Sequence, residues 1–140
     1  MTQAPDIADL QAHLTRSPFH QLFDPAVLEI DRQKLSLVIR AHHSATLERQ
    51  PETGQWHGGA IAALVDIAGC YALTLIGAEP LPTINFRTDY LRPAIDTDLQ
   101  ASARVRQAGR SIGVVDVDIS NDAGKLVAVG RGTYSMKPFS

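Results

Sequence analysis

Apolar and polar positions alternate with a period of two through the second half of the chain, which predicts β-strands there. Turn residues separate four such segments, at Arg92 and Pro93, at Gly109 and Arg110, and at residues 121–124. Their apolar positions are Ile84, Phe86 and Tyr90; Leu99, Ala101, Ala103 and Val105; Val115, Val117 and Ile119; and Leu126, Ala128 and Tyr134. Such one-sided patterns are typical of an antiparallel sheet that is covered on one face.

A long apolar segment from Gly58 to Ile76 precedes these strands. It is rich in Ala and Leu, which favour helix, and it is apolar on every side. Its length approaches that of a membrane span. Its alanines and glycines are only weakly hydrophobic, however, and Asp66 lies near its middle. We therefore predict a buried central helix that ends at Gly77.

The first part of the chain predicts shorter elements. Residues 6–23, with a helix-start signal at Ser17 and Pro18, predict one or two short helices in an N-terminal helical segment, residues 1–24. Two short strands are expected around Val27, Leu28 and Ile30, and around Leu35, Leu37 and Ile39, and residues 42–55 are expected to form a loop. The predicted fold class is α+β. A long central helix is wrapped by an antiparallel sheet of five to six strands in a single domain, residues 1–140.

Composition excludes several classes of function. The chain is 44% hydrophobic and 20% charged, and its 13 basic and 15 acidic residues give a net charge of -2, which argues against a nucleic-acid partner. One cysteine excludes an internal disulfide framework and a thiolate zinc cluster. His42 and His43 are adjacent and would point to opposite faces of a strand, so we expect no metal site. With no basic residue ahead of an apolar run at the start, a cytoplasmic protein without a membrane partner is expected.

Asp66 is the only formally charged residue between His57 and Gly77. An ionised carboxylate in apolar surroundings costs several kcal/mol unless something compensates it. It is therefore paired, protonated, or faces a cavity that water and substrate can enter. A structural Asp, hydrogen-bonded to backbone or to an Arg, is the alternative to a functional one. We favour function because of the motif that precedes the helix.

That motif is His57, Gly58 and Gly59. Two glycines at a helix start leave backbone N–H groups uncovered at the positive end of the helix dipole. Such a position can hold a carbonyl oxygen and stabilise the negative charge that develops on it during acyl transfer. The alternative is that both glycines only allow another backbone to approach closely. For His57, we favour helix capping over a role as catalytic acid.

The spacing of Gly58 and Asp66 has a consequence for assembly. They are eight residues apart, which is ~12 Å along one helix. Both therefore cannot contact one reacting carbon from the same chain. Two helices packed antiparallel about a twofold axis would bring Gly58 of one chain towards Asp66 of the other. If both serve one site, the protein is at least a homodimer with two equivalent sites, or a tetramer of such dimers.

Longer motifs carry a family resemblance between about residues 25 and 134. They read W-H-G-G-A-I-A-A-L-V-D-I-A-G, T-I-N-F-R-T-D-Y-L-R-P-A, G-R-S-I-G-V-V-D-V-D-I and D-A-G-K-L-V-A-V-G. The chain resembles hotdog-fold acyl-CoA thioesterases of the phenylacetate-degradation (PaaI-like) type. The resemblance implies hydrolysis of an acyl- or aryl-CoA thioester to free acid and coenzyme A. Coenzyme A is then part of the substrate, with no further cofactor and no metal.

The resemblance also implies roles for individual residues. Asp66 would act as general base or nucleophile, and Gly58 of the partner subunit would supply the oxyanion-hole amide. His57 would shape that hole, and the Thr83 hydroxyl would help hold the attacking water. The implied substrate-binding residues are Gly59, Arg92, Arg110 and Ser111. The last three fall near the strand turns where the family binds the coenzyme A phosphates and pantetheine.

One position departs from the family pattern. The Asn of the family's Asn-x-x-Gly-x-x-His is Pro51 here, and Gln50 or Glu52 are the neighbours that could replace it. Pro51 keeps open a non-catalytic acyl-CoA-binding or sensor module. A hotdog hydratase or dehydratase is a further alternative. That chemistry usually needs a His paired with the acid across the site, and here only His57 is available.

Overall fold

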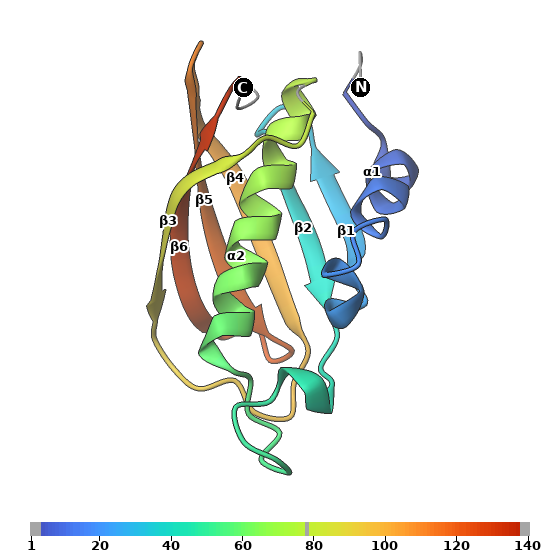
Figure 1. Cartoon of the computed structure of the whole chain (residues 1–140), viewed down its shortest axis with the longest axis vertical. Helices are drawn as coiled ribbons and strands as arrows, with labels where there is room; N and C mark the ends of the chain where they lie inside the picture. Colours follow the sequence, from blue (N-terminus) through green and yellow to red (C-terminus); the bar gives the residue numbers. More distant parts are fainter. Residues whose placement is uncertain (1–3, 78, 138–140) are drawn as a thin grey trace.

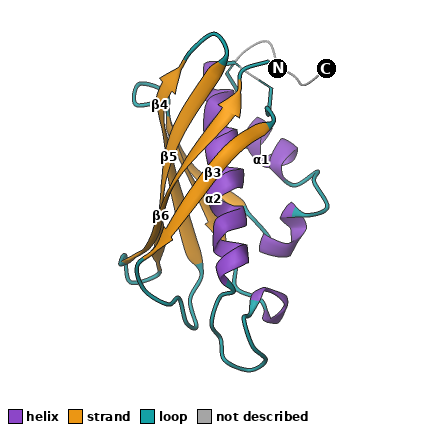
Figure 2. Cartoon of the chain, turned by 60° about the vertical axis from the view of Figure 1, so that its left-hand side comes forward, coloured by secondary structure: helices purple, strands orange, loops and turns teal. Residues whose placement is uncertain are grey.

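A computed structural model describes residues 4–77 and 79–137. One long helix lies against one face of a six-stranded antiparallel sheet (Figure 1, Figure 2). The helices are α1 (Ile7–Leu14), η1 (His20–Phe23), η2 (Ala45–Leu47), α2 (Gly58–Ala72) and η3 (Leu73–Ile76). The strands are β1 (Ala26–Asp31), β2 (Ser36–Ala41), β3 (Thr83–Tyr90), β4 (Leu99–Ala108), β5 (Ile112–Asn121) and β6 (Leu126–Ser135). The predicted α+β class and central helix are confirmed.

Strand order explains where the two edges of the sheet lie. The order is β1-β2-β4-β5-β6-β3, so β1 and β3 are the edge strands. All neighbouring strands pair antiparallel. Helix α2 contacts every strand from β2 to β6. The core therefore lies between α2 and the sheet, and the buried side chains of β2, β4, β5 and β6 point into it.

Helix α2 begins and ends where the sequence predicts. His57 is its N-cap, in extended backbone, and Gly77 ends the following η3 turn in the left-handed region at φ 86°. The segment Gly58–Ile76 is long and apolar enough to cross a membrane, with a mean hydropathy of 1.9, but 61% of that segment is buried in the fold. This burial matches the predicted central core helix.

The N-terminal helices pack on the same core. Asp6 and Asp9 form a capping box at the start of α1, because each side chain accepts a hydrogen bond from the other residue's amide. Leu10 and Leu14 of this helix are fully buried. The turn at Ser17 leads into η1, which buries Phe23. The N-terminal segment thus contributes side chains to the main core.

Two details of the predicted strand patterns are wrong. At the start of β6, Leu126 is exposed and Val127 is buried, because the pairing with β5 shifts at Ser120 and changes which side chain faces inward. On β3, Ile84, Phe86 and Tyr90 are 49%, 37% and 51% exposed instead of packed in the core. β3 is an edge strand, so no further strand in the described part of the chain lies beside it to shelter these side chains.

Candidate active site

Asp66 lies at the middle of α2, above the point where β3 and β6 pair. Thr83, the first residue of β3, donates a hydrogen bond from its hydroxyl to Oδ1 of Asp66 at 2.7 Å. Asp66 is half-buried and forms no ion pair with a described residue. The structure thus brings Thr83 and Asp66, two of the residues singled out from the sequence, into contact. One carboxylate oxygen is thus oriented by a hydroxyl, and the group is neither closed in an ion pair nor sealed in the core.

Tyr134 fixes the backbone beneath this carboxylate. It pairs with Thr83 across the two strands, and its hydroxyl donates to the main-chain oxygen of Asp66 at 3.0 Å. The ring is fully buried, and burial raises the pKa of the Tyr134 hydroxyl, which keeps it a neutral donor. Gly69 and Gly132 make room for it, because a Cβ on either would lie within 2.5 Å of its oxygen.

Tyr134→Phe should lower the free energy of unfolding by about 1 kcal/mol, because it removes one buried hydrogen bond while keeping the ring. Denaturation in urea measures this change. Tyr71→Phe is the matched control, since that hydroxyl contacts the ring of His13 at 3.0 Å and lies away from Asp66. If Tyr71→Phe lowers the free energy of unfolding and Tyr134→Phe does not, the Tyr134 hydroxyl does not stabilise this part of α2.

The first turn of α2 presents one free amide. His57 accepts a hydrogen bond at Nδ1 from the amide of Gly59 at 2.8 Å, and its carbonyl oxygen accepts from Ala60 and Ile61 at 3.0 and 3.2 Å. This leaves the Gly58 amide without an acceptor among the described residues. The capping role that the sequence favours for His57 is confirmed. A neutral imidazole that accepts at Nδ1 carries its proton on Nε2.

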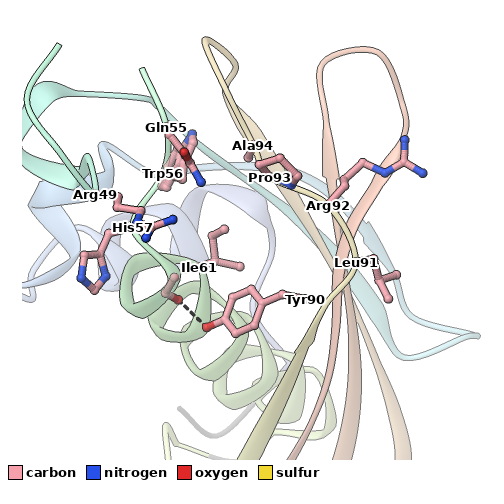
Figure 3. A pocket seen from close by; sticks show the side chains of 11 residues that line it. Arg49, Gln55, Trp56, His57, Ile61, Tyr90, Leu91, Arg92, Pro93 and Ala94 are labelled. Atoms are coloured by element: carbon pink, nitrogen blue, oxygen red, sulfur yellow. Dashed lines mark hydrogen bonds between the residues drawn. The ribbon is translucent and has the colours of Figure 1, made fainter. Parts of the chain in front are cut away.

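Gly58 also borders a cleft of about 630 Å³, which we call the arginine cleft. Its lining residues are Arg49, Gln55, Trp56, His57, Gly58, Ile61, Tyr90, Leu91, Arg92, Pro93 and Ala94. Figure 3 shows Tyr90 reaching back from β3 to the start of α2, where its hydroxyl donates to the carbonyl oxygen of Gly58 at 2.5 Å. The arginines make this cleft suited to anionic and polar groups.

The sequence missed Arg49 and Tyr90 as members of this site. Arg49 comes from an irregular loop, where no periodic pattern indicates which way a side chain points. Trp56 both lines the cleft and anchors the loop, because its Nε1 donates to the carbonyl oxygen of Thr97 at 2.8 Å. Tyr90 had a detectable signal, as the last apolar position of its strand.

The predicted substrate-binding residues do not gather in one place within a chain. Arg92 lines the arginine cleft beside Gly58. Ser111 lies at the other end of the sheet, where its carbonyl oxygen accepts from the Met136 amide, and Gly113, two residues further on, lies close to Leu73 near the end of the helix. Arg110 precedes Ser111 in the same hairpin. Within one chain the structure therefore separates Arg110 and Ser111 from Arg92 by the length of α2 (Figure 1).

Gly58 and Asp66 are likewise separated along one straight helix. Both lie on α2, eight residues apart, so the ~12 Å separation derived from the sequence stands. Pro51 lies in an exposed turn together with Gln50 and Glu52. Nothing in the described part of the chain joins this turn to Asp66. A single chain holds each half of the expected site at a different level of the helix.

His42 and His43 follow β2 and bind two different carboxylates. Nδ1 of His42 lies 3.1 Å from Oδ2 of Asp98, and Nε2 of His43 lies 3.2 Å from Oε2 of Glu48. Asp98 also accepts from Arg40 at 2.9 Å. The pKa of the Asp98 carboxyl is lowered, because hydrogen bonds from the His43 amide, Arg40 and His42 outweigh its desolvation. These contacts connect the end of the sheet to the loop that leads into α2.

Cys70 lies one turn after Asp66 and is sheltered. Burial raises the pKa of its thiol to about 11, and Sγ contacts the carbonyl oxygen of Leu81 at 3.4 Å. Since the thiolate is the reactive form, we expect Cys70 in the native protein to react with 5,5′-dithiobis(2-nitrobenzoate) at pH 8 at least ~10²-fold more slowly than in the unfolded chain. Equal rates in stopped-flow absorbance would contradict the burial. A slow rate also gives thiol-release assays a low background.

Comparison with known proteins identifies the family. Residues 53–128 match the family model of the thioesterase superfamily. The chain is 39% identical over 77 residues to the acyl-coenzyme A thioesterase PaaI of Escherichia coli, a segment that covers 54% of each protein. It is 28% identical over 138 residues to the medium/long-chain acyl-CoA thioesterase YigI of Salmonella typhimurium, covering 83% of this chain and 86% of that protein. A solved structure of a thioesterase-superfamily protein superposes with a TM-score of 0.87 at 33% identity, over 94% of this chain and 98% of the other. This chain, with its hotdog fold, therefore belongs to the thioesterase superfamily.

Proposed function

We propose that this thioester hydrolase cleaves acyl-CoA to free acid and coenzyme A at sites shared between two copies of the chain. The observation that carries the proposal is the pairing of two features on one helix. Asp66 is oriented by Thr83, and the Gly58 amide at the helix start has no acceptor among the described residues. A carboxylate and a free amide are the two groups that addition of water to a carbonyl requires.

In the proposed reaction, Asp66 takes a proton from water as the water oxygen bonds to the thioester carbon. The carbonyl oxygen becomes negative and accepts a hydrogen bond from Gly58 of the partner subunit. The C–S bond then breaks, and the proton goes to the departing sulfur of coenzyme A. Thr83 donates to Oδ1 of Asp66, so Oδ2 is the oxygen that faces the water. Direct attack by the carboxylate is the second route open to the same group.

Strand β3 is the surface through which we propose that two copies pair. It is an edge strand, and Ile84, Phe86 and Tyr90 are exposed on it. A long edge with apolar side chains is a template for another strand. Pairing of β3 with its own copy about a twofold axis runs the two α2 helices in opposite directions. In this dimer the Gly58 end of one helix would lie near the middle of the other helix. Arg92 of one chain would lie towards the end of the partner subunit that carries Ser111.

Phe86→Asp should convert the dimer to a monomer and reduce specific activity at least about tenfold at about 1 µM protein, with recovery at higher concentration. The charge would be buried without a partner in the paired state only, so the single chain still folds. Sedimentation velocity measures the oligomeric state, circular dichroism measures folding, and the thioesterase assay measures specific activity. Leu28→Asp on the opposite edge strand, where Leu28 is 43% exposed, is the matched control. A monomeric but fully active Phe86→Asp protein would contradict the shared site.

A panel of acyl-CoA substrates tests the reaction itself. Release of free thiol measured with 5,5′-dithiobis(2-nitrobenzoate) indicates hydrolysis. A change in the acyl chain without thiol release, seen by mass spectrometry, would indicate a hydratase or dehydratase. Tight binding without either product would indicate a sensor module and would overturn the proposal.

A further inference from the structure

Two hollows of opposite character meet at the start of α2. On one side lies the arginine cleft. On the other lies a second hollow of about 320 Å³, which we call the apolar groove. Its apolar wall consists of Phe19, Leu22, Phe23 and Leu47. On the side of α2 it is lined by Gly59 and Ala60. His57 borders both hollows, so the start of α2 lies between them.

Two of the large apolar side chains that line the apolar groove are exposed. Phe19 is 51% exposed and Leu22 is 42% exposed, although large apolar side chains gain by burial. Phe23 beneath them is fixed, because it packs edge-to-face on Phe19 and stacks on Trp56. Glu48 also borders the groove, but its carboxylate accepts from the Gly54 amide and contacts His43, each at 3.2 Å. The groove therefore offers an occupant mainly apolar contact.

We propose that the apolar groove binds the acyl chain of the thioester, while the arginine cleft binds the coenzyme A side. This inference rests on the proposed function. An acyl-CoA has one hydrocarbon end and one anionic end, joined at the reacting carbonyl. The two hollows have the same two characters, joined at the start of α2 where the free Gly58 amide lies. Gly59 and Ala60 carry little side chain, so an acyl chain can lie against the first turn of the helix.

The substrate class that follows is an aliphatic acyl group longer than acetyl. The wall residues Phe19, Leu22 and Phe23 lie outside residues 53–128, the part that matches the family model. Preference among acyl groups would therefore be set by the N-terminal segment of this chain, separately from the residues that carry out hydrolysis. Each methylene that enters the groove should raise kcat/KM about fourfold until the groove is full.

The test compares acetyl-, hexanoyl-, decanoyl- and hexadecanoyl-CoA as substrates of the full chain. Leu22→Trp narrows the groove and Phe19→Ala removes part of its wall; both positions are exposed, so both variants should fold. We expect each to lower the decanoyl-to-acetyl ratio of kcat/KM at least about tenfold, with acetyl-CoA changed less than about twofold. Leu28→Trp, at an equally exposed leucine on β1, is the matched control and should leave the ratio unchanged.

The outcomes separate this inference from the proposed function. If no acyl-CoA is hydrolysed by the unmodified protein, the proposed function fails. If hydrolysis occurs but both groove variants keep the ratio of Leu28→Trp, the groove does not hold the acyl chain and the inference fails alone. If Leu22→Trp loses activity towards all four substrates and also sediments as a monomer, a second copy of the chain occupies the groove, which likewise overturns it.

Discussion

Asp66→Asn is expected to lower kcat for acyl-CoA hydrolysis by at least about 10²-fold while leaving the fold intact. The amide keeps the size of the carboxylate and still accepts the hydrogen bond from Thr83 at Oδ1. It cannot take a proton from water or attack the thioester. The loss should therefore appear in kcat, with KM changed little, because substrate contacts remain in place. Steady-state kinetics with a thiol reagent measure kcat and KM, and a circular dichroism melt shows whether the fold is intact.

Asp118→Asn is the matched control for this variant. Asp118 is an exposed carboxylate on β5, so its replacement changes the net charge equally without entering the candidate site. It should retain activity within about twofold. If Asp66→Asn turns over acyl-CoA as the unmodified chain does, the carboxylate has no role in the chemistry and the proposed mechanism must be abandoned.

Gly58→Pro is expected to lower kcat by about 10² to 10³-fold, the usual effect of losing one oxyanion-hole donor. Gly58 is the first residue of α2, where proline is well tolerated, and His57 before it is extended at ψ 135°, as a residue preceding proline should be. The substitution thus deletes an N–H at a position where the helix does not need it. Gly58→Ala keeps the N–H, and its Cβ would make ordinary 3.5 Å contacts with Tyr90. It should therefore remain active.

Mixing the two inactive variants tests whether the site is shared. In a dimer of Asp66→Asn with Gly58→Pro, one site receives the intact Asp66 of one chain and the intact Gly58 of the other. Random exchange of equal amounts should restore about a quarter of the unmodified activity, because half of the dimers are mixed and each has one complete site. Retained inactivity after verified subunit exchange would place both residues in the same chain's site and contradict the proposed geometry.

The sequence predicted the order of elements well because each has a strong local pattern. Helix α2 was predicted from a long segment that is apolar on every side, and β4 and β5 were predicted from the alternation of apolar and polar positions. β3 was different. Its alternation correctly indicated a strand, but the prediction that its apolar side is covered was wrong for the single chain, because local spacing does not specify what covers an edge strand.

The candidate site divides in the same way. Asp66 was identified because it is a charged residue in an apolar helix, and Gly58 because it is one of two glycines at the helix start. Both signals are local features of the sequence. Arg49 was missed because its place in the cleft depends on how an irregular loop returns to the helix. Tyr134 was recognised only as an apolar strand position, since its contact with Asp66 joins residues 68 positions apart in the chain.

The uncovered apolar side of β3 has a consequence for the life of the newly made protein. A solitary chain would expose Ile84 and Phe86 beside an unsatisfied backbone edge, the kind of surface on which misassembly begins. Burying that surface against an identical chain would protect the protein and build its catalytic sites in one step. Under the proposed arrangement, dilution would dissociate the dimer, which would both abolish activity and expose the aggregation-prone edge. The dissociation constant of the dimer would therefore set the lowest concentration at which the enzyme works.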